Sequence, residues 1–101
     1  MASLFVIQGR DQGRRFDLAD AAQTIGRDAT NQIQLHDDEA SRRHAELHRA
    51  GGEFELVDLE SSNGTWVNGK KVERTSLRTG DKVTIGKTLL LFTGGSTDSD
   101  S

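Results

Sequence analysis

Hydrophobic and polar residues alternate along much of this chain with a period of two. In the run 44–48, Ala45 and Leu47 occupy one face, whereas the two histidines and Glu46 occupy the other. This alternation is typical of a β-strand with one buried face. By the same pattern, further short strands are predicted at 4–7, 15–18, 24–26, 33–35, 53–56, 66–67, 83–85 and 89–92.

Turn signals separate these predicted strands. Gly51-Gly52 and Asn68-Gly69 each lie between two strand-like segments, at the spacing of tight hairpins that need positive φ angles. No long segment shows a helical stripe, and 19–22 allows at most one helical turn. The chain is therefore predicted to be all-β, as an antiparallel sandwich or barrel. Trp66 is expected in the core or partly buried on its strand.

Composition narrows the class of protein. A length of 101 residues fits one domain, and the absence of cysteine excludes a disulfide scaffold or a thiolate zinc site. No apolar run exceeds four residues, so neither a membrane span nor a signal peptide is expected. These features lead us to expect a soluble cytoplasmic domain.

The negative charge is concentrated at the C-terminus. The chain carries a net charge of −3, and 96–101 contains two aspartates and no hydrophobic side chain. We interpret 1–95 as the domain and 96–101 as a disordered polar tail or the start of a linker. The remaining 14 acidic and 13 basic residues nearly balance. This balance argues against a general binder of nucleic acids or membranes.

Three stretches between the predicted strands carry side chains suited to an anion. They are 26–27, 41–44 and the run 61–65 followed by 68–69. Arginines supply forked cationic donors, while serine hydroxyls and an asparagine amide add neutral donors. Loops at one end of a sandwich converge although they are distant in sequence, so a single anion site is expected there.

In this order and spacing, these stretches resemble the forkhead-associated (FHA) domain, a module that binds phosphothreonine peptides. The resemblance extends from the first predicted strand to Phe92. It rests on Ile25-Gly26-Arg27, Asn31 to Leu35, Ser41 to Ala45, Asp58 to Gly69 and Leu77 to Gly86. It implies a sandwich of about eleven short strands, with binding loops at one end and phosphopeptide recognition as the function.

The resemblance also implies contacts to the phosphothreonine. Arg27 would be the main cation for the phosphate, and Ser41 would donate its hydroxyl to a phosphate oxygen. Asn63 would hold the main chain of the peptide. Ser62 and Arg42 complete the binding set, with Arg42 as the second cation. Arg43 is the reserve candidate for that second cation.

Other residues are assigned structural or selective roles. The resemblance implies that His44 braces the binding loops through hydrogen bonds without touching the phosphate. Four further residues are expected to shape the backbone of the loops: Gly26, Gly64, Asn68 and Gly69. Side chains near Glu39 help FHA domains to select the peptide residue three places after the phosphothreonine. We expect Glu39 to disfavour an acidic residue there.

The predicted function is phosphothreonine-dependent binding in serine/threonine kinase signalling, without catalysis and without a cofactor or metal. The expected partner is a kinase, a kinase substrate or a phosphorylated segment of the same protein, and neither nucleic acid nor a membrane is expected. One alternative is an FHA-like scaffold that binds a partner through a sheet face without phosphate. A less favoured alternative is a nucleic-acid module, since only 5% of the residues are aromatic and can stack on bases.

Several motif-like strings do not support an enzyme. Gly86-Lys87-Thr88 resembles the end of a nucleotide-binding P-loop, but Asp81 stands where the first glycine is needed and a strand follows. The serine at 41, with the histidine at 44 and the aspartate at 58, lacks the strained elbow of a hydrolase nucleophile. The three histidines show no metal-binding spacing.

Overall fold

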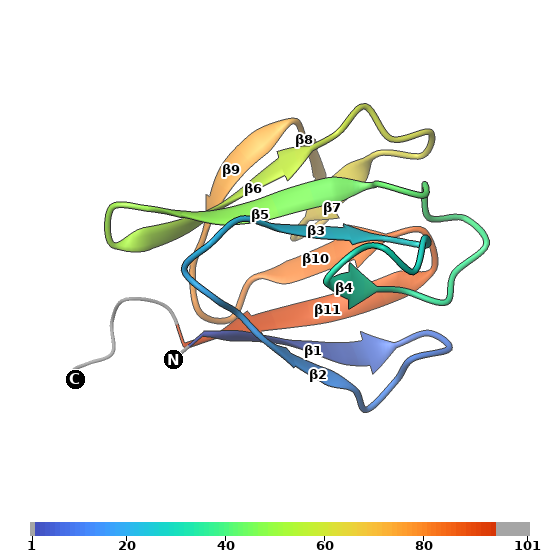
Figure 1. Ribbon diagram of the computed structural model, residues 1–101, viewed down its shortest axis with the longest axis horizontal. Helices are drawn as coiled ribbons and strands as arrows, with labels where there is room; N and C mark the ends of the chain where they lie inside the picture. The colour runs from blue at the N-terminus through green and yellow to red at the C-terminus, as the bar shows by residue number, and fades with distance from the viewer. Residues whose placement is uncertain (1, 95–101) are drawn as a thin grey trace.

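The computed structural model describes residues 2–94 and contains eleven β-strands (Figure 1). They are β1 (Ser3–Gln8), β2 (Arg15–Asp17), β3 (Gln23–Gly26), β4 (Ile33–Gln34), β5 (Ala45–Ala50), β6 (Glu53–Asp58), β7 (Thr65–Val67), β8 (Lys70–Val72), β9 (Arg74–Leu77), β10 (Lys82–Ile85) and β11 (Thr88–Thr93). The tail predicted at 96–101 lies outside the described residues. In the part that is described, no helix is long and apolar enough to cross a membrane.

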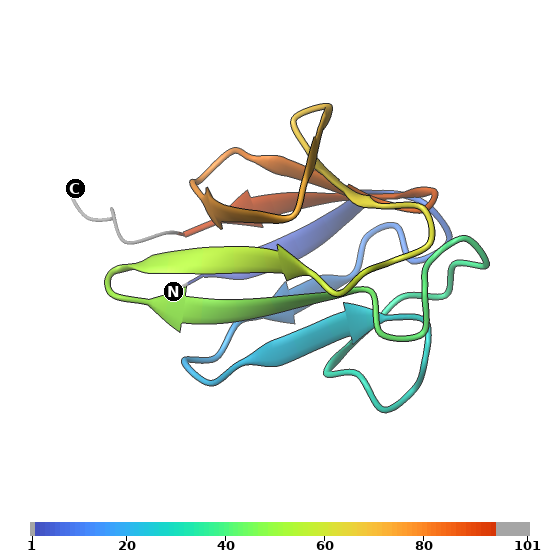
Figure 2. The ribbon, with the colours of Figure 1, turned by 90° about the horizontal axis from the view of Figure 1, so that it is seen from above.

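The strands form two layers, as Figure 2 shows. One sheet has six strands in the order β2-β1-β11-β10-β7-β8, and the other has five in the order β4-β3-β5-β6-β9. The predicted all-β sandwich is therefore confirmed. One pair departs from the antiparallel expectation, because β4 lies parallel to β3, with Ile25 beside Ile33.

The core lies between the two sheets and is built from the inward positions of each strand. In β11, Leu90 and Phe92 are fully buried, whereas Leu89 and Leu91 on the other face are only partly covered. Phe92 meets Phe54 of the opposite sheet edge to face, with ring centroids 5.9 Å apart. Burial of these apolar faces supplies the main driving force for folding.

Both predicted hairpins are present, and two strands were missed. Gly51 joins β5 to β6 with a φ of 66°, and Asn68 and Gly69 join β7 to β8 with φ values of 52° and 85°. At 68–69 both central residues have positive φ, which gives that turn a twist that matches the strands, whereas at 51–52 only Gly51 does. The missed strands β8 and β9 are sheet edges with mostly exposed side chains, so their hydrophobic alternation is weak.

Candidate functional site

At the candidate site, the backbone at the end of β3 lies very close to the segment that precedes β5. The backbone N–H of Arg27 donates to the carbonyl of Ser41 at 3.0 Å, and the N–H of Asp28 donates to that of Arg42 at 3.2 Å. A Cβ atom on Gly26 would lie only 2.1 Å from the carbonyl oxygen of Arg42. Glycine is therefore required at 26 for Arg27 to lie beside Ser41.

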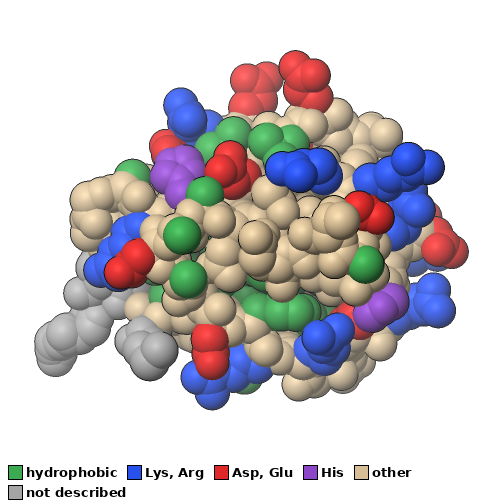
Figure 3. All heavy atoms as spheres, in the orientation of Figure 1, with side chains coloured by type: hydrophobic (Ala, Val, Ile, Leu, Met, Phe, Trp, Pro, Cys, Tyr) green, Lys and Arg blue, Asp and Glu red, His purple; other side chains and the backbone are tan. Residues whose placement is uncertain are grey.

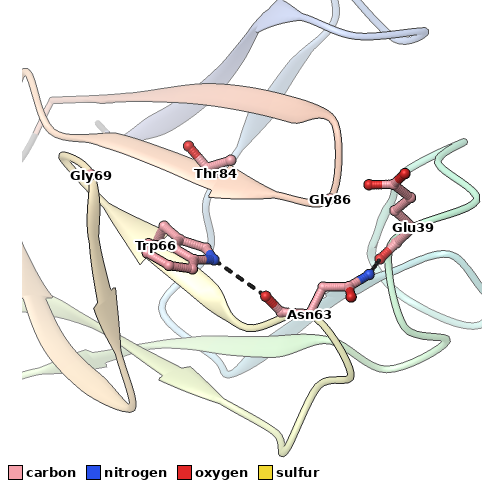
Figure 4. Close-up of a pocket in the computed structure, with 6 residues that line it drawn as sticks. All are labelled: Glu39, Asn63, Trp66, Gly69, Thr84 and Gly86. Atoms are coloured by element: carbon pink, nitrogen blue, oxygen red, sulfur yellow. Dashed lines mark hydrogen bonds between the residues drawn. The ribbon is translucent and has the colours of Figure 1, made fainter.

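Two hydrogen bonds join the connection before β5 to the connection between β6 and β7. The N–H of Ser62 donates to Oγ of Ser41 at 3.0 Å, and the amide Nδ2 of Asn63 donates to the carbonyl of Glu39 at 2.8 Å (Figure 4). The structure therefore brings Arg27, Ser41, Ser62 and Asn63 together, although they are far apart in sequence.

His44 links the same two connections from below. Its ring is fully buried; Nδ1 accepts a hydrogen bond from the N–H of Ser41 at 3.0 Å. Because Nδ1 accepts, Nε2 carries the proton and donates to the carbonyl of Gly64 at 2.8 Å. Gly64 itself has a φ of 86°, which favours glycine. His44 thus fixes the backbone that carries Ser41 without reaching the surface.

Asp58 organises the connection between β6 and β7. Its carboxylate accepts hydrogen bonds from the hydroxyls of Ser61 and Thr65, at 2.5 and 2.7 Å, and from the N–H of Ser61. Oγ of Ser61 in turn accepts from the N–H of Gly64. Burial of Asp58 opposes its ionisation, but these hydrogen bonds outweigh it and lower the pKa of its carboxyl. The three side chains of the rejected hydrolase triad therefore have structural contacts instead.

A second carboxylate, Asp37, anchors the connection before β5 to the turn between β10 and β11. It accepts hydrogen bonds from the N–H of Lys87 at 2.8 Å, the hydroxyl of Thr88 at 2.6 Å and the N–H of Glu39. A Cβ on Gly86 would lie 2.8 Å from this carboxylate. The P-loop-like string 86–88 therefore binds an internal carboxylate. Neither Asp37 nor Asp58 was predicted as a loop anchor. Nothing local in the sequence indicates the distant partners of Asp37 at 87 and 88, whereas the partners of Asp58 at 61 and 65 lie close to it in sequence.

The three arginines of the predicted site are exposed, and Arg42 interacts electrostatically with the carboxylate of Asp28. Nε of Arg27 donates to the carbonyl of Ala40 at 3.1 Å, and within residues 2–94 neither Arg27, Arg42 nor Arg43 forms an ion pair. Arg49, in contrast, pairs with Asp20 at 2.8 Å. The guanidinium groups of the site are therefore available for an anionic ligand. No hydrogen bond among the described residues joins the side chains of Arg42 and Arg43 to this cluster.

The side chain of Asn68 bonds the start of β10 and not the binding loops, whereas Gly69 lines a pocket together with Glu39 and Asn63. The side chain of Asn68 donates to Asp81 and accepts from the N–H of Lys82, both at 3.0 Å. These contacts fix the β7–β8 hairpin to the start of β10. In the described structure, Asn68 makes no hydrogen bond to the loops that carry Arg27 and Ser41.

A pocket of about 240 Å³ adjoins Asn63 (Figure 4). It is lined by Glu39, Asn63, Trp66, Gly69, Thr84 and Gly86. The indole N–H of Trp66 donates to the carbonyl of Asn63 at 3.2 Å. Trp66 was expected in the core or partly buried, but 38% of its surface is exposed because its neighbours on β7 take the inward positions. No group of side chains in 2–94 is arranged to hold a metal ion.

The β-sandwich and its joined loops define a recognition domain of the FHA type. A family model for the FHA domain matches residues 23–86. This chain belongs to that family, as its sequence motifs indicated.

Curated relatives and solved structures agree with this assignment. The chain is 44% identical over 100 residues to the glycogen accumulation regulator GarA of Mycolicibacterium smegmatis, covering 99% of this chain and 63% of GarA. It is 45% identical over 94 residues to the oxoglutarate dehydrogenase inhibitor of Corynebacterium efficiens, covering 93% of this chain and 66% of that protein. The chain thus spans less than two thirds of the length of either relative.

Two solved structures share the fold closely. One comes from a study of phosphothreonine-dependent FHA domain interactions, with a TM-score of 0.86, 33% identity and coverage of 92% of this chain and 95% of that chain. The other is Mycobacterium tuberculosis EmbR in complex with a low-affinity phosphopeptide. Its TM-score is 0.85 at 31% identity, over 98% of this chain and 26% of that chain.

Proposed function

We propose that this chain binds phosphothreonine peptides and acts as a non-catalytic regulatory module in serine/threonine kinase signalling. The observation that carries the proposal is the cluster at the binding loops. Arg27 has no acidic partner in the described residues and lies beside Ser41, which is joined to Ser62. Neighbouring this cluster, Arg42 and Arg43 add positive charge.

The donors at the cluster suit a phosphate group. A phosphothreonine carries about −1.5 to −2 charges and three acceptor oxygens. Arg27 supplies charge-assisted hydrogen bonds to these oxygens. The hydroxyl of Ser41 already accepts from Ser62, and its own proton remains to be donated to the phosphate. Arg42 provides the second cation, with Arg43 in reserve.

Asn63 and Glu39 are positioned to contact the peptide around the phosphothreonine. Nδ2 of Asn63 bonds the carbonyl of Glu39, which leaves Oδ1 to accept from a peptide N–H. Such a peptide is expected to bind with a Kd near about 1 μM. Part of the gross attraction is offset by ordering of the flexible peptide.

The partner is proposed to be a phosphorylated protein in the cytoplasm: a kinase, a kinase substrate or a phosphorylated segment of the same protein. The names of the relatives, a regulator of glycogen accumulation and an inhibitor of oxoglutarate dehydrogenase, support a regulatory role. The structure of an FHA protein with a phosphopeptide supports the ligand class.

A phosphopeptide-library pull-down tests this proposal. Immobilised 101-residue chain is incubated with a library that has phosphothreonine at a fixed place, and with the matched unphosphorylated library. Capture only of the phosphorylated library is expected. Equal capture of both libraries would refute the proposal, and binding of single-stranded oligonucleotides that weakens with salt would favour the nucleic-acid alternative.

A further inference from the structure

The outer face of the six-stranded sheet carries an apolar strip. Phe5 on β1 lies opposite Leu91 on β11, and Leu89 on β11 lies opposite Thr84, which is opposite Trp66 on β7. We use the name outer strip for Phe5, Leu89, Leu91 and Trp66. All four alternate along their strands with buried residues and point away from the core, so the outer strip faces outward.

The outer strip is not part of the hydrophobic core. Among the described residues, the partly buried apolar side chains that pack on the core are Phe16 and Val72, and no member of the strip is among them. Apolar residues that cluster on a surface mark sites of interaction more often than single exposed ones do.

The outer face of the five-stranded sheet differs. Its outward positions on β5 and β6 include Glu46, His48 and Glu55, with Val57 as an apolar exception. Figure 3, in the orientation of Figure 1, shows charged side chains and histidines scattered among hydrophobic ones over the face in view. In this molecule, the apolar outer surface is therefore found on the six-stranded sheet and not on the five-stranded sheet.

Cations border the outer strip at both sides. Arg15 lies opposite Phe5 with its guanidinium 5.6 Å from the ring centroid, and Lys82 lies opposite Leu91. Lys71 lies opposite Trp66 on the edge strand β8. Asp17 bonds Arg15 at 2.9 Å and is the acidic neighbour on β2. The border on β2, β10 and β8 is thus positive, although the chain as a whole has a net charge of −3 and Glu39 lines the pocket beside Trp66.

We propose that the outer strip docks an acidic, amphipathic segment of the same partner protein that carries the phosphothreonine. The apolar side chains of that segment would cover the strip, while its carboxylates would meet Arg15, Lys82 and Lys71. A second copy of this chain fits less well, because a two-fold face-to-face contact would bring these cations together. Residues 95–101 are acidic but have no hydrophobic side chain to cover the strip.

The outer strip is continuous with the proposed phosphopeptide site, and the inference rests on that function. Trp66 belongs to the strip and also donates its indole N–H to the carbonyl of Asn63. The pocket between them is lined by both binding loops and sheet residues. One partner chain can therefore leave the loops through this pocket and continue over Trp66 onto the sheet.

The test compares short and extended phosphopeptides on the 101-residue chain. A short phosphothreonine peptide enriched from the library is extended at either end by about 15 random residues, enough to cross the sheet as strand or helix. Extended peptides are selected on the wild-type chain, and their Kd values are measured by fluorescence anisotropy. The variants are the double change Leu89→Thr with Leu91→Thr, the charge reversal Lys82→Glu, and Val57→Thr as a matched control on the other outer face.

Acidic and apolar residues are expected to be enriched in the selected extensions. The extended peptides should bind the wild-type chain at least about tenfold more tightly than the short peptide. The double variant and Lys82→Glu should lose this gain, whereas Val57→Thr keeps it. All variants should bind the short peptide unchanged, which also shows that they are folded.

Four outcomes overturn the proposal. Extensions without an affinity gain, or a gain that survives in both strip variants, contradict it while the phosphopeptide function stands. A dimer in sedimentation that the double variant abolishes assigns the strip to a second copy. If the short phosphopeptide does not bind the wild-type chain, the proposed function fails and this inference fails with it.

Discussion

The backbone N–H of Arg27 donates a hydrogen bond of 3.0 Å to the carbonyl oxygen of Ser41. The main proposed phosphate cation and the proposed hydroxyl donor are therefore held together by main chain, not by flexible side chains. Such pre-organisation lowers the entropy that ligand binding must offset. The bond depends on the absence of a side chain at 26, which leads to the first prediction.

Gly26→Ala should disrupt both stability and binding. The added methyl group would lie 2.1 Å from the carbonyl oxygen of Arg42, so the strand end and the loop must separate. We expect a loss of about 1–3 kcal/mol in the free energy of unfolding, measured by urea denaturation, and loss of phosphopeptide affinity.

Gly51→Ala is the matched control for that change. A Cβ at 51 meets no atom within 4 Å, although its φ of 66° is unfavourable for alanine. A stability loss from backbone strain alone, with unchanged peptide affinity, is expected. If Gly26→Ala, like Gly51→Ala, leaves peptide affinity unchanged, the close packing of Gly26 against the carbonyl of Arg42 does not hold the site together.

His44→Ala should destabilise the domain through the loops. The change leaves the N–H of Ser41 and the carbonyl of Gly64 without their ring partner and opens a cavity. A loss of about 2–4 kcal/mol is expected in thermal or urea unfolding. His48→Ala removes a half-buried histidine on the outer face and should cost much less. Similar costs for both histidines would contradict the bracing role.

Asp37 should make stability dependent on acidic pH. Burial opposes ionisation of Asp37, but hydrogen bonds from Thr88, Glu39 and Lys87 lower the pKa of its carboxyl below the ordinary value of 3.8. A carboxyl with a lowered pKa in the folded state stabilises that state fully above its unfolded pKa. This contribution is lost as the pH falls through the folded pKa.

Asp37→Asn should therefore lower the free energy of unfolding at pH 7 and flatten its decline below about pH 4. Urea unfolding at a series of pH values measures both effects. The exposed neighbour Asp38 serves as the control through Asp38→Asn, which should leave the curve unchanged. A variant at 37 that is as stable as the wild type at neutral pH would show that this anchor is dispensable.

Glu39 should select against acidic peptide residues three places after the phosphothreonine. Its carboxylate is about half exposed beside the pocket, and the Nζ of Lys87 at 3.9 Å gives only weak compensation. A phosphopeptide array should show depletion of Asp and Glu at that place, and Glu39→Lys should reverse the preference. Strong enrichment of Asp on the wild-type chain would contradict this role.

The sequence predicted the strands in which hydrophobic and polar residues alternate because one face is buried in the core. It missed β8 and β9, because edge strands with exposed side chains lack that alternation. It left open whether Trp66 is in the core or partly buried on its strand, and its outward place with 38% exposure follows from the burial of both neighbours on β7. In a strand as short as β7, the alternation of side chains did not by itself show which residues face the core.

The sequence motifs predicted the residues of the candidate site but not the carboxylates, Asp37 and Asp58, that hold its loops in place. The hydrogen bond that the hydroxyl of Thr88 donates to Asp37 spans 51 positions in the sequence, and no local signal indicates such a partner. For Asn68, the motif predicted a role in shaping the binding loops. Its side chain instead bonds Asp81 and Lys82. Side-chain partners across the two sheets emerge only once the strands are paired.

Calorimetric titration with one library-selected phosphothreonine peptide tests the central claim most directly. The wild-type chain should bind it with a Kd near about 1 μM and should not bind its unphosphorylated form. Arg27→Ala should weaken binding at least about 100-fold while the fold is retained, and Arg49→Ala, at an arginine already paired with Asp20, should not. Full affinity in Arg27→Ala, or equal affinity for the unphosphorylated peptide, would contradict phosphate recognition at these loops.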